Sequence, residues 1–240
     1  MRHTLFISDI HLEPQRPDIT AGFEYFLKTQ AVNADALYIL GDLFEAWIGD
    51  DAQSAFTRQI QGALAELKIP VYLMRGNRDF LLGQAFARET NCELLTDPYK
   101  IKLYGQDIIL SHGDMLCTLD KKHQRFRKYA HNPQYNRFFL MLPLQFRLWL
   151  ARKIRHASRN HTRNTAYTIM DVTAEAVDQL MQQHQVKLLI HGHTHRPAIH
   201  ALNSDHYRIV LGDWDKQVSA LKFYENGSYE LLALELASPS

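Results

Sequence analysis

The sequence is poor in cysteine: Cys92 and Cys117 are the only two in 240 residues, and no CxxC spacing occurs. Two distant cysteines cannot form the disulfide framework that holds small secreted domains together. We therefore expect a protein of a reducing, cytosolic compartment that depends on a hydrophobic core. With 46% hydrophobic residues the chain is long enough to bury one, which excludes the disordered and fibrous classes.

Long apolar runs are also missing. No segment reaches the roughly 18 consecutive apolar residues that a membrane-spanning helix requires. The N-terminal segment meets an acidic residue, Asp9, too early for a signal peptide. We expect neither a transmembrane helix nor secretion.

Acidic residues are absent from Lys121 to Met170, a segment that carries twelve lysine and arginine residues. The remaining chain holds 15 basic and 26 acidic residues, so the net charge of +1 conceals two regions of opposite sign. A charged run is ordinarily a solvated face. A run this long without one acid favours an anionic partner instead: phosphate, nucleic acid or an acidic membrane surface.

The same basic stretch is rich in aromatic and aliphatic residues. Phe146, Leu150 and Ile154 recur at helical spacing with arginines beside them, which predicts an amphipathic helix. We interpret residues 120–168 as a mostly helical insertion cap on a core formed by residues 1–119 and 169–240. Its apolar side either packs on that core or faces lipid, and the sequence leaves both interpretations open.

Short apolar runs in the core region predict buried strands, two of which are followed within two residues by an acidic residue. Helical spacing occurs between the first three runs, at 21–32 and 54–67. The Asn226-Gly227 pair predicts a hairpin between the last two. The pattern is that of an α/β (α+β) fold with strands at 4–8, 36–40, 70–74, 100–103, 107–111, 187–191, 207–211, 218–224 and 229–234.

Five segments share one character: a strand end, a small residue, then a side chain able to bind metal. In extended chain, residues two apart point the same way, so the Asp9/His11 and His193/His195 pairs can each converge. A single histidine pair is usually structural, but five such segments in order favour a metal site. They are Ser8-Asp9-Ile10-His11, Gly41-Asp42, Gly76-Asn77-Arg78-Asp79, Ser111-His112-Gly113-Asp114 and His191-Gly192-His193-Thr194-His195.

The donor set indicates which metals fit. It offers imidazole nitrogen and carboxylate or amide oxygen but no thiolate, which suits manganese, iron, cobalt or zinc better than calcium. Seven ligands are too many for one tetrahedral ion and suit two hexacoordinate ions bridged by a carboxylate. Two such ions about 3.5–4 Å apart are typical of phosphoester hydrolysis. The predicted ligands are Asp9, His11, Asp42, Asn77, His112, His193 and His195.

The order DxH, GD, GN, H, GHxH resembles the calcineurin-like metallophosphoesterase family. The resemblance implies an αββα sandwich of two largely antiparallel sheets with the ligands on loops at the sheet ends. It also implies that Asp42 bridges the ions, with Asp9, His11 and His195 on one. The other ion would take Asn77, His112 and His193, while His191 matches no ligand and is expected to serve local packing.

Segments 38–50, 76–81, 112–114 and 191–197 are similar to one branch of that family. This branch hydrolyses UDP-2,3-diacylglucosamine to UMP and 2,3-diacylglucosamine 1-phosphate (lipid X) in lipid A biosynthesis. The resemblance implies two manganese ions, a helical cap that holds the acyl chains, and peripheral attachment to the cytoplasmic face of the bacterial inner membrane. It implies neither a nucleic-acid partner nor an obligate protein partner.

The resemblance also implies which residues act. Asp42, Asn77, Arg78 and His112 are the expected catalytic residues, and Asp79 and Asp114 either support them or are ordinary turn aspartates. Thr165 departs from the family pattern, which has lysine there; Arg163 or Arg159 is a candidate replacement. The expected substrate contacts are Asn77, Arg78, Asp120, Ser158, Thr162, Thr165 and His193.

Arg78 bears on the type of bond that is cleaved. Most members of the wider family have histidine there, placed to protonate the leaving group, whereas arginine stays charged near neutral pH. A phosphate leaving group needs little protonation, so Arg78 favours a pyrophosphate substrate, attacked at its α-phosphorus by metal-activated water. The alternatives are another calcineurin-like phosphodiesterase or phosphatase and, more remotely, a non-catalytic scaffold that binds a membrane or a protein.

Overall fold

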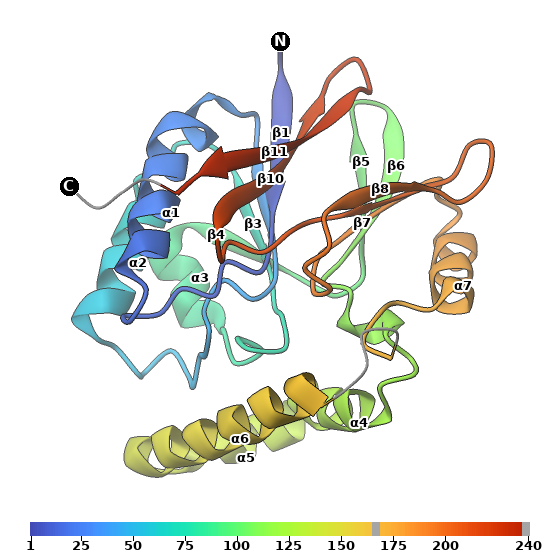
Figure 1. Cartoon of the computed structure of the whole chain (residues 1–240). Helices are drawn as coiled ribbons and strands as arrows, with labels where there is room; N and C mark the ends of the chain where they lie inside the picture. Colours follow the sequence, from blue (N-terminus) through green and yellow to red (C-terminus); the bar gives the residue numbers. More distant parts are fainter. Residues whose placement is uncertain (165–168, 237–240) are drawn as a thin grey trace.

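The computed structural model describes residues 1–164 and 169–236, with the backbone alone for residues 156–164. Two β-sheets pack face to face between an outer layer of three helices and an outer layer of one, as Figure 1 shows. The expected αββα sandwich is therefore confirmed. Three further helices lie at the end of the sandwich toward which β1 (His3–Ile7) runs.

The first sheet has six strands in the order β11-β10-β1-β2-β3-β4. Strands β1 to β4 run parallel, and β10 and β11 extend the sheet antiparallel. Every residue of β1 and β2 is buried, which explains their continuous apolar runs. The other strands are β2 (Leu37–Leu40), β3 (Val71–Met74), β4 (Cys92–Leu95), β10 (Gln217–Tyr224) and β11 (Tyr229–Glu235).

The second sheet has five strands in the order β5-β6-β7-β9-β8. Its three central strands are parallel and its edge strands antiparallel. Both sheets are thus mixed, and the expectation of largely antiparallel sheets was wrong. The strands are β5 (Tyr99–Leu103), β6 (Gln106–Ser111), β7 (Leu188–His191), β8 (Ala198–Ala201) and β9 (Tyr207–Val210).

Helices α1 (Pro17–Thr29), α2 (Ala55–Ala65) and α3 (Gln84–Thr90) cover the first sheet, and α7 (Ala174–His184) covers the second (Figure 1). Helix α1 begins before the expected residue 21 because Pro17 fits a first helical turn and Asp18 suits the positive helix end. After Thr29 the chain passes into the 3₁₀-helix η1 (Ala31–Asn33).

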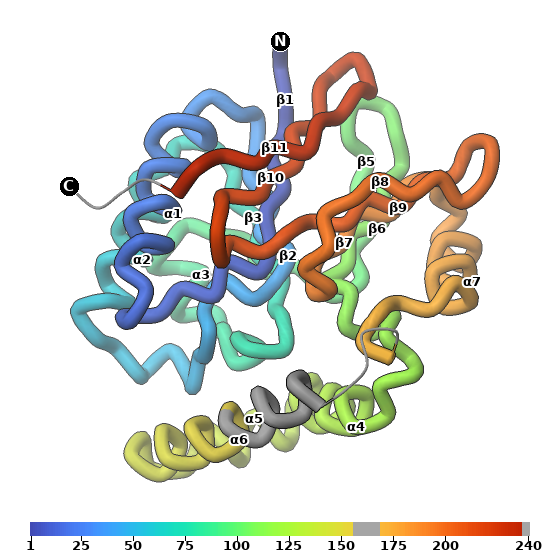
Figure 2. The backbone as a smooth tube through the Cα atoms, in the orientation of Figure 1, coloured from blue at the N-terminus to red at the C-terminus, as the bar shows by residue number. Residues whose placement is uncertain are grey.

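The core between the two sheets is entirely apolar at its centre. Phe6, Leu40, Leu110, Ile190 and Leu221 are fully buried there and join strands from both sheets. The chain path in Figure 2 places the C-terminal hairpin beside β1, the first strand, so the two ends of the sequence share one sheet. This rigid sandwich fixes the strand ends from which the polar loops emerge.

Helices α4 (Lys121–Ala130), α5 (Pro133–Met141) and α6 (Leu144–Asn164) form the basic segment, and we call them the cap. Asp120 caps α4 and Asn132 caps α5 through their side chains. The described part of the segment expected to be mostly helical thus holds three helices. Among the described residues no helix is long and apolar enough to span a membrane.

One buried arginine ties the cap to the core. The side chain of Arg147 at the start of α6 is only 2% exposed. Its guanidinium donates to the Ile48 carbonyl at 2.7 Å and to Asp51 Oδ1 at 2.8 Å, and its Nε donates to the Leu142 carbonyl at 3.0 Å. These bonds fix the α5–α6 turn against the loop that follows β2.

Candidate metal centre

The predicted ligands follow the carboxyl ends of five parallel strands. Asp9 follows β1, Asp42 follows β2, Asn77 follows β3, His112 follows β6 and His193 follows β7. Backbone hydrogen bonds join the loops: His11 N donates to the Asp42 carbonyl at 3.0 Å, and Gly192 N to that of His112 at 2.9 Å. Parallel pairing therefore brings side chains that are distant in the sequence to one edge.

The backbone at the ligands is left-handed rather than extended. The φ angles are 53° at Asp9, 55° at His11, 53° at Asp42, 68° at His193 and 56° at His195. Asp9 and His11 converge as expected, together with His195, but the reason given, alternation along an extended chain, was wrong. Left-handed residues other than glycine are uncommon, and such strain concentrates at functional sites.

Asp9, His11 and His195 form one group of possible ligands whose donor atoms lie within 4.8 Å of one another. The Nε2 atoms of the two histidines are 3.3 Å apart, and His195 Nε2 is 3.3 Å from Asp9 Oδ1. Asp9 Oδ1 is buried and has no hydrogen-bond partner. A buried carboxylate oxygen left unpaired beside two ring nitrogens fits a cation, because a cation would satisfy all three.

Asp9, Asp42 and His112 form a second group. His112 donates its Nδ1 proton to the Leu40 carbonyl at 2.9 Å, which leaves Nε2 facing Asn77 Oδ1 at 3.1 Å and Asp42 Oδ2 at 3.8 Å. The His193 ring packs against the His112 ring at 5.1 Å between centroids. All seven predicted ligands thus come together.

Asp42 lies between the two groups. Its Oδ2 atom is 3.8 Å from His112 Nε2 and 4.0 Å from His11 Nδ1, while its Oδ1 accepts a hydrogen bond from Arg78 N at 2.8 Å. One carboxylate oxygen thus faces a histidine of each group, the position a bridging ligand requires. Asp9 belongs to both groups as well, which the sequence did not indicate.

The electrostatics of the site suit positive charge. Burial alone raises the pKa of Asp9, but His195, His112 and His11 lower it well below its usual range. Burial lowers the pKa of His112, yet Asp42 and Asp9 raise it to about 9. Burial and the neighbouring His112 hold the pKa of His193 well below its usual value, so its ring stays neutral. Asp9 is therefore ionised, as a carboxylate that binds a cation must be.

Two aspartates that the sequence left ambiguous have distinct positions. Asp79 is fully buried and accepts from Gly76 N at 2.7 Å and Leu43 N at 2.8 Å, so it joins the loop carrying Asn77 to the loop carrying Asp42. Asp114 is also fully buried and accepts from Arg127 Nε of α4 at 3.0 Å. Both support the loops of the site, and neither is an ordinary exposed turn residue.

His191 takes the structural role expected of it. Its Nδ1 donates to the Gly192 carbonyl at 2.9 Å, and its Nε2 accepts from Arg208 at 3.3 Å, inside a fully buried position. Sequence reasoning missed Asp213, which lies 3.1 Å from His195 Nδ1 and can orient that ring. It also missed Glu45, whose signal was its place three residues after Asp42 on the same loop.

The expected substrate contacts are only partly described. Arg78 lies at the site, and its Nη1 donates to Glu45 Oε1 at 3.1 Å. Asp120 accepts from His123 N at 2.9 Å, and the His123 ring lies 5.1 Å from that of His193. The structure does not describe the side chains of the other expected residues, which are Ser158, Arg159, Thr162, Arg163 and Thr165.

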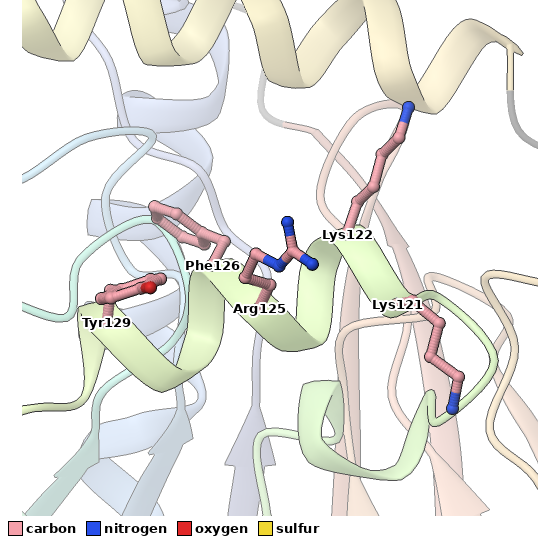
Figure 3. A pocket seen from close by; sticks show the side chains of 5 residues that line it. All are labelled: Lys121, Lys122, Arg125, Phe126 and Tyr129. Atoms are coloured by element: carbon pink, nitrogen blue, oxygen red, sulfur yellow. The ribbon is translucent and has the colours of Figure 1, made fainter.

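A cavity of about 520 Å³ opens along α4. Its lining combines two aromatic rings with three cationic side chains, all from this helix, as Figure 3 shows. Phe126 also packs edge-on against Phe80, which follows the loop of Asn77 and Arg78. The cavity thus lies on the cap and is lined by Lys121, Lys122, Arg125, Phe126 and Tyr129.

His131 makes stability depend on pH. Burial lowers its pKa to about 4; Asp114 opposes this shift, and Arg127 and Arg75 add to it. In the unfolded chain the value is about 6.5, so the unfolded state binds more protons between these limits. The contribution of neutral His131 to the free energy of unfolding is therefore complete above pH 6.5 and is lost as the pH falls toward 4.

We expect the His131→Gln variant to lose less stability on acidification. Between pH 7.5 and 5, the free energy of unfolding of the parent should fall by about 1–2 kcal/mol more than that of the variant. Urea denaturation of both proteins at the two pH values measures the difference. Equal losses would show that His131 does not titrate in this window.

Comparison with known proteins agrees with this geometry. Residues 2–197 match the family described as calcineurin-like phosphoesterases. A Coxiella burnetii protein named UDP-2,3-diacylglucosamine hydrolase is 54% identical over 241 residues, which cover 98% of this chain and 99% of the relative. A Pseudomonas aeruginosa protein of the same name is 53% identical over 229 residues, covering 93% and 95%.

A solved structure shares the fold. Hypothetical protein PH1004 from Pyrococcus horikoshii aligns with a TM-score of 0.52 at 11% identity, over 99% of this chain and 89% of that one. At this identity the likeness concerns the arrangement of the sheets and helices alone.

Proposed function

Because the chain belongs to the calcineurin-like phosphoesterase family, we propose that it hydrolyses the pyrophosphate bond of UDP-2,3-diacylglucosamine. The products would be UMP and 2,3-diacylglucosamine 1-phosphate, a step of lipid A biosynthesis. One observation carries the proposal: proteins named for this activity match almost the whole chain at up to 54% identity. The cluster of metal-capable donors at the strand ends supports it.

We assign the site to two manganese ions. Asp9, His11, Asp42 and His195 would hold one, and Asp42, Asn77, His112 and His193 the other. The fit rests on the unpaired Asp9 Oδ1, the mixed nitrogen and oxygen donors, and Asp42 Oδ2 between His11 and His112. When bound, such ions neutralise charge on phosphoryl oxygens and lower the pKa of the attacking water.

The chain's own residues position these groups and the substrate. Ser8 Oγ at 2.6 Å and His193 N at 2.8 Å both donate to Asp9 Oδ2, which leaves Oδ1 for a cation. Arg78 is fixed through its backbone to Asp42 and carries a permanent charge toward the phosphate. Asn77 and His193, which we assign to a metal, would also contact the sugar phosphate.

The cap suits a substrate that is both anionic and acylated. The α4 cavity joins cationic side chains to the aromatic faces of Phe126 and Tyr129. Acyl chains need apolar walls, and a sugar phosphate needs cations. Asp120, Ser158, Thr162 and Thr165 are proposed to contact the glucosamine and its acyl groups, with Arg163 or Arg159 replacing the cation absent at Thr165.

A substrate comparison tests this assignment. The diacyl substrate should be turned over at least 100-fold more efficiently than UDP-glucosamine without acyl chains, since the apolar walls act only on the former. Equal rates would instead favour a calcineurin-like enzyme that acts on soluble diphosphates or phosphodiesters. Absence of stoichiometric manganese in the purified protein, with no turnover, would favour a scaffold.

We further propose peripheral attachment to the cytoplasmic face of the inner membrane through the cap. Exposed apolar side chains lie among its basic residues: Phe138 is 68% exposed, Met141 73% and Trp149 47%. Such a surface suits anionic lipid. Phe139, by contrast, packs against the core and does not belong to this surface.

Removing two exposed rings should weaken membrane binding. A Phe138→Ser, Trp149→Ser variant should bind vesicles containing phosphatidylglycerol at least tenfold more weakly, because each ring contributes about 1.5–3 kcal/mol when fully buried in lipid. Vesicle co-sedimentation measures this. Tyr25→Ser, which removes an exposed ring from α1, is the matched control and should bind normally. Undiminished binding by the double variant would contradict the proposed surface.

A further inference from the structure

Glu45 holds two arginines that come from different parts of the molecule. Arg78 Nη1, from the core loop after β3, lies 3.1 Å from Glu45 Oε1. Arg155 Nη2, from α6 of the cap, lies 2.5 Å from the same oxygen. The other carboxylate oxygen, Oε2, lies 3.2 Å from His11 Nδ1. One side chain thus touches a proposed metal ligand, a proposed substrate residue and the cap.

The two guanidinium groups are more open than the carboxylate between them. The side chains of Arg78 and Arg155 are 25% and 22% exposed, against 11% for Glu45. Two positive charges therefore converge on one negative oxygen at the edge of the metal centre.

This arrangement matches what a pyrophosphate needs. Planar guanidinium groups bind phosphate oxygens through paired N–H donors, and two of them suit two adjacent phosphoryl groups. The position of Glu45 Oε1, between the guanidiniums, is one that a phosphoryl oxygen could occupy. Glu45 would then give up its contacts with the two guanidinium groups to the ligand.

We propose that Arg155 is a further substrate-binding residue and that Glu45 is an internal competitor, whose carboxylate lies between Arg78 and Arg155 until the substrate binds. In the free protein Glu45 occupies the place of the anion. The pyrophosphate takes that place when it binds, and the contact of Arg155 with it draws α6 onto the core. The proposal rests on the proposed function, because it concerns the same site and a diphosphate ligand.

The cap does not depend on this contact for its attachment. Arg147 already fixes the start of α6 through Ile48 and Asp51. Arg155 also has a second partner, since its Nη2 lies 3.0 Å from Glu13 Oε2. Exchange of Glu45 for a phosphate therefore leaves the cap docked, and a substitution at Glu45 tests competition for the arginines rather than folding.

Binding of UDP-N-acetylglucosamine, which has the pyrophosphate but no long acyl chains, tests the proposal without turnover. Calorimetry on the manganese-loaded protein measures its Kd. Arg155→Ala should raise the Kd at least tenfold, whereas Arg152→Ala, which removes an exposed cation one turn away on α6, should leave it within twofold. An unchanged Kd in Arg155→Ala would overturn the assignment.

For Glu45→Gln, the direction of the change in Kd for UDP-N-acetylglucosamine tests the proposal. The substitution removes the charge that competes with the ligand, so the Kd should fall about fivefold with the metal content unchanged. Glu13→Gln changes the net charge equally, and among the described side chains Glu13 pairs with Arg155 but not with Arg78, so its effect should be less than half as large. Weaker or unchanged binding by Glu45→Gln would mean that the contact is a structural ion pair.

Kinetics complete the test. Arg155→Ala should raise KM for the diacyl substrate with kcat within threefold, which loss of a merely structural contact would not produce. The experiments distinguish failure of the proposed hydrolase function from failure of the proposed binding role of Arg155. If the parent protein binds the UDP-sugar in the Arg155-dependent way but does not hydrolyse UDP-2,3-diacylglucosamine, the proposed function fails and the binding role stands. If the parent hydrolyses UDP-2,3-diacylglucosamine but Arg155→Ala leaves both Kd and KM unchanged, the proposed function stands and the binding role of Arg155 fails.

Discussion

Replacing Asp42 by alanine should lower turnover of UDP-2,3-diacylglucosamine by at least about 10³-fold, because one carboxylate serves both halves of the site. Its Oδ2 atom faces His11 and His112, and its Oδ1 fixes the backbone of Arg78. The substitution therefore removes a shared ligand and releases the loop that carries Asn77. Manganese content, measured by plasma mass spectrometry, should fall together with the rate.

The control for Asp42 is Asp107→Ala, which removes an exposed carboxylate on β6 that pairs with Lys100. This variant should retain full activity and full metal content. Circular dichroism of both variants checks that the sandwich is intact. Near-normal turnover by a folded Asp42→Ala protein would contradict the assignment of the centre.

Substitution of Arg78 should lower activity strongly and alter the preferred leaving group. Arg78→Ala should reduce kcat/KM for the diacyl substrate by about 10²-fold, since it removes a charge-assisted contact with the phosphate. Arg78→Lys should recover only part of the loss, because an ammonium group lacks the planar pair of donors. Steady-state kinetics with the three proteins measure these effects.

Arg78→His tests the idea that arginine marks a pyrophosphate substrate. Histidine can donate a proton near neutral pH, so the variant should gain, relative to Arg78→Ala, on phosphodiesters with alkoxide leaving groups. It should gain nothing on the pyrophosphate, whose phosphate leaving group needs little protonation. Equal gains on both substrates would show that the residue at position 78 does not determine which type of bond is cleaved.

Much of the core was predictable because its strands are short, apolar and bounded by polar loops. Strands β1, β2 and β3 appear within about one residue of their expected limits. Two strands were missed for physical reasons. Strand β4 contains Glu93 and is short, and β8 is an edge strand with alternating exposure that carries His200. Neither forms an apolar run.

The residues of the candidate centre were predictable, but not the way the backbone presents them. The order of five strand-end motifs named the five side chains of the two ligand groups, and also Asn77 and His193 beside His112. Nothing in the sequence shows that Asp9, His11 and His195 are left-handed, since that conformation depends on the contacts around the loops. The same holds for the sharing of Asp9 between both groups.

Contacts between cap and core lay beyond the sequence pattern. The basic cap was visible from its charge, yet which of its arginines face inward was not. Arg147 and Arg155 differ in no local feature from the exposed Arg152, and only the packing of α6 on the core separates them. Glu45 likewise gains its significance from partners at residues 11, 78 and 155.

Hydrolysis of UDP-2,3-diacylglucosamine in ¹⁸O-labelled water with added manganese tests the account most directly. Attack at the α-phosphorus predicts equal amounts of UMP and 2,3-diacylglucosamine 1-phosphate, with the label in UMP alone by mass spectrometry. Loss of activity on chelation and its return with manganese would place the reaction at the metal centre. Label in the sugar phosphate, or no hydrolysis by the manganese-loaded protein, would contradict the account.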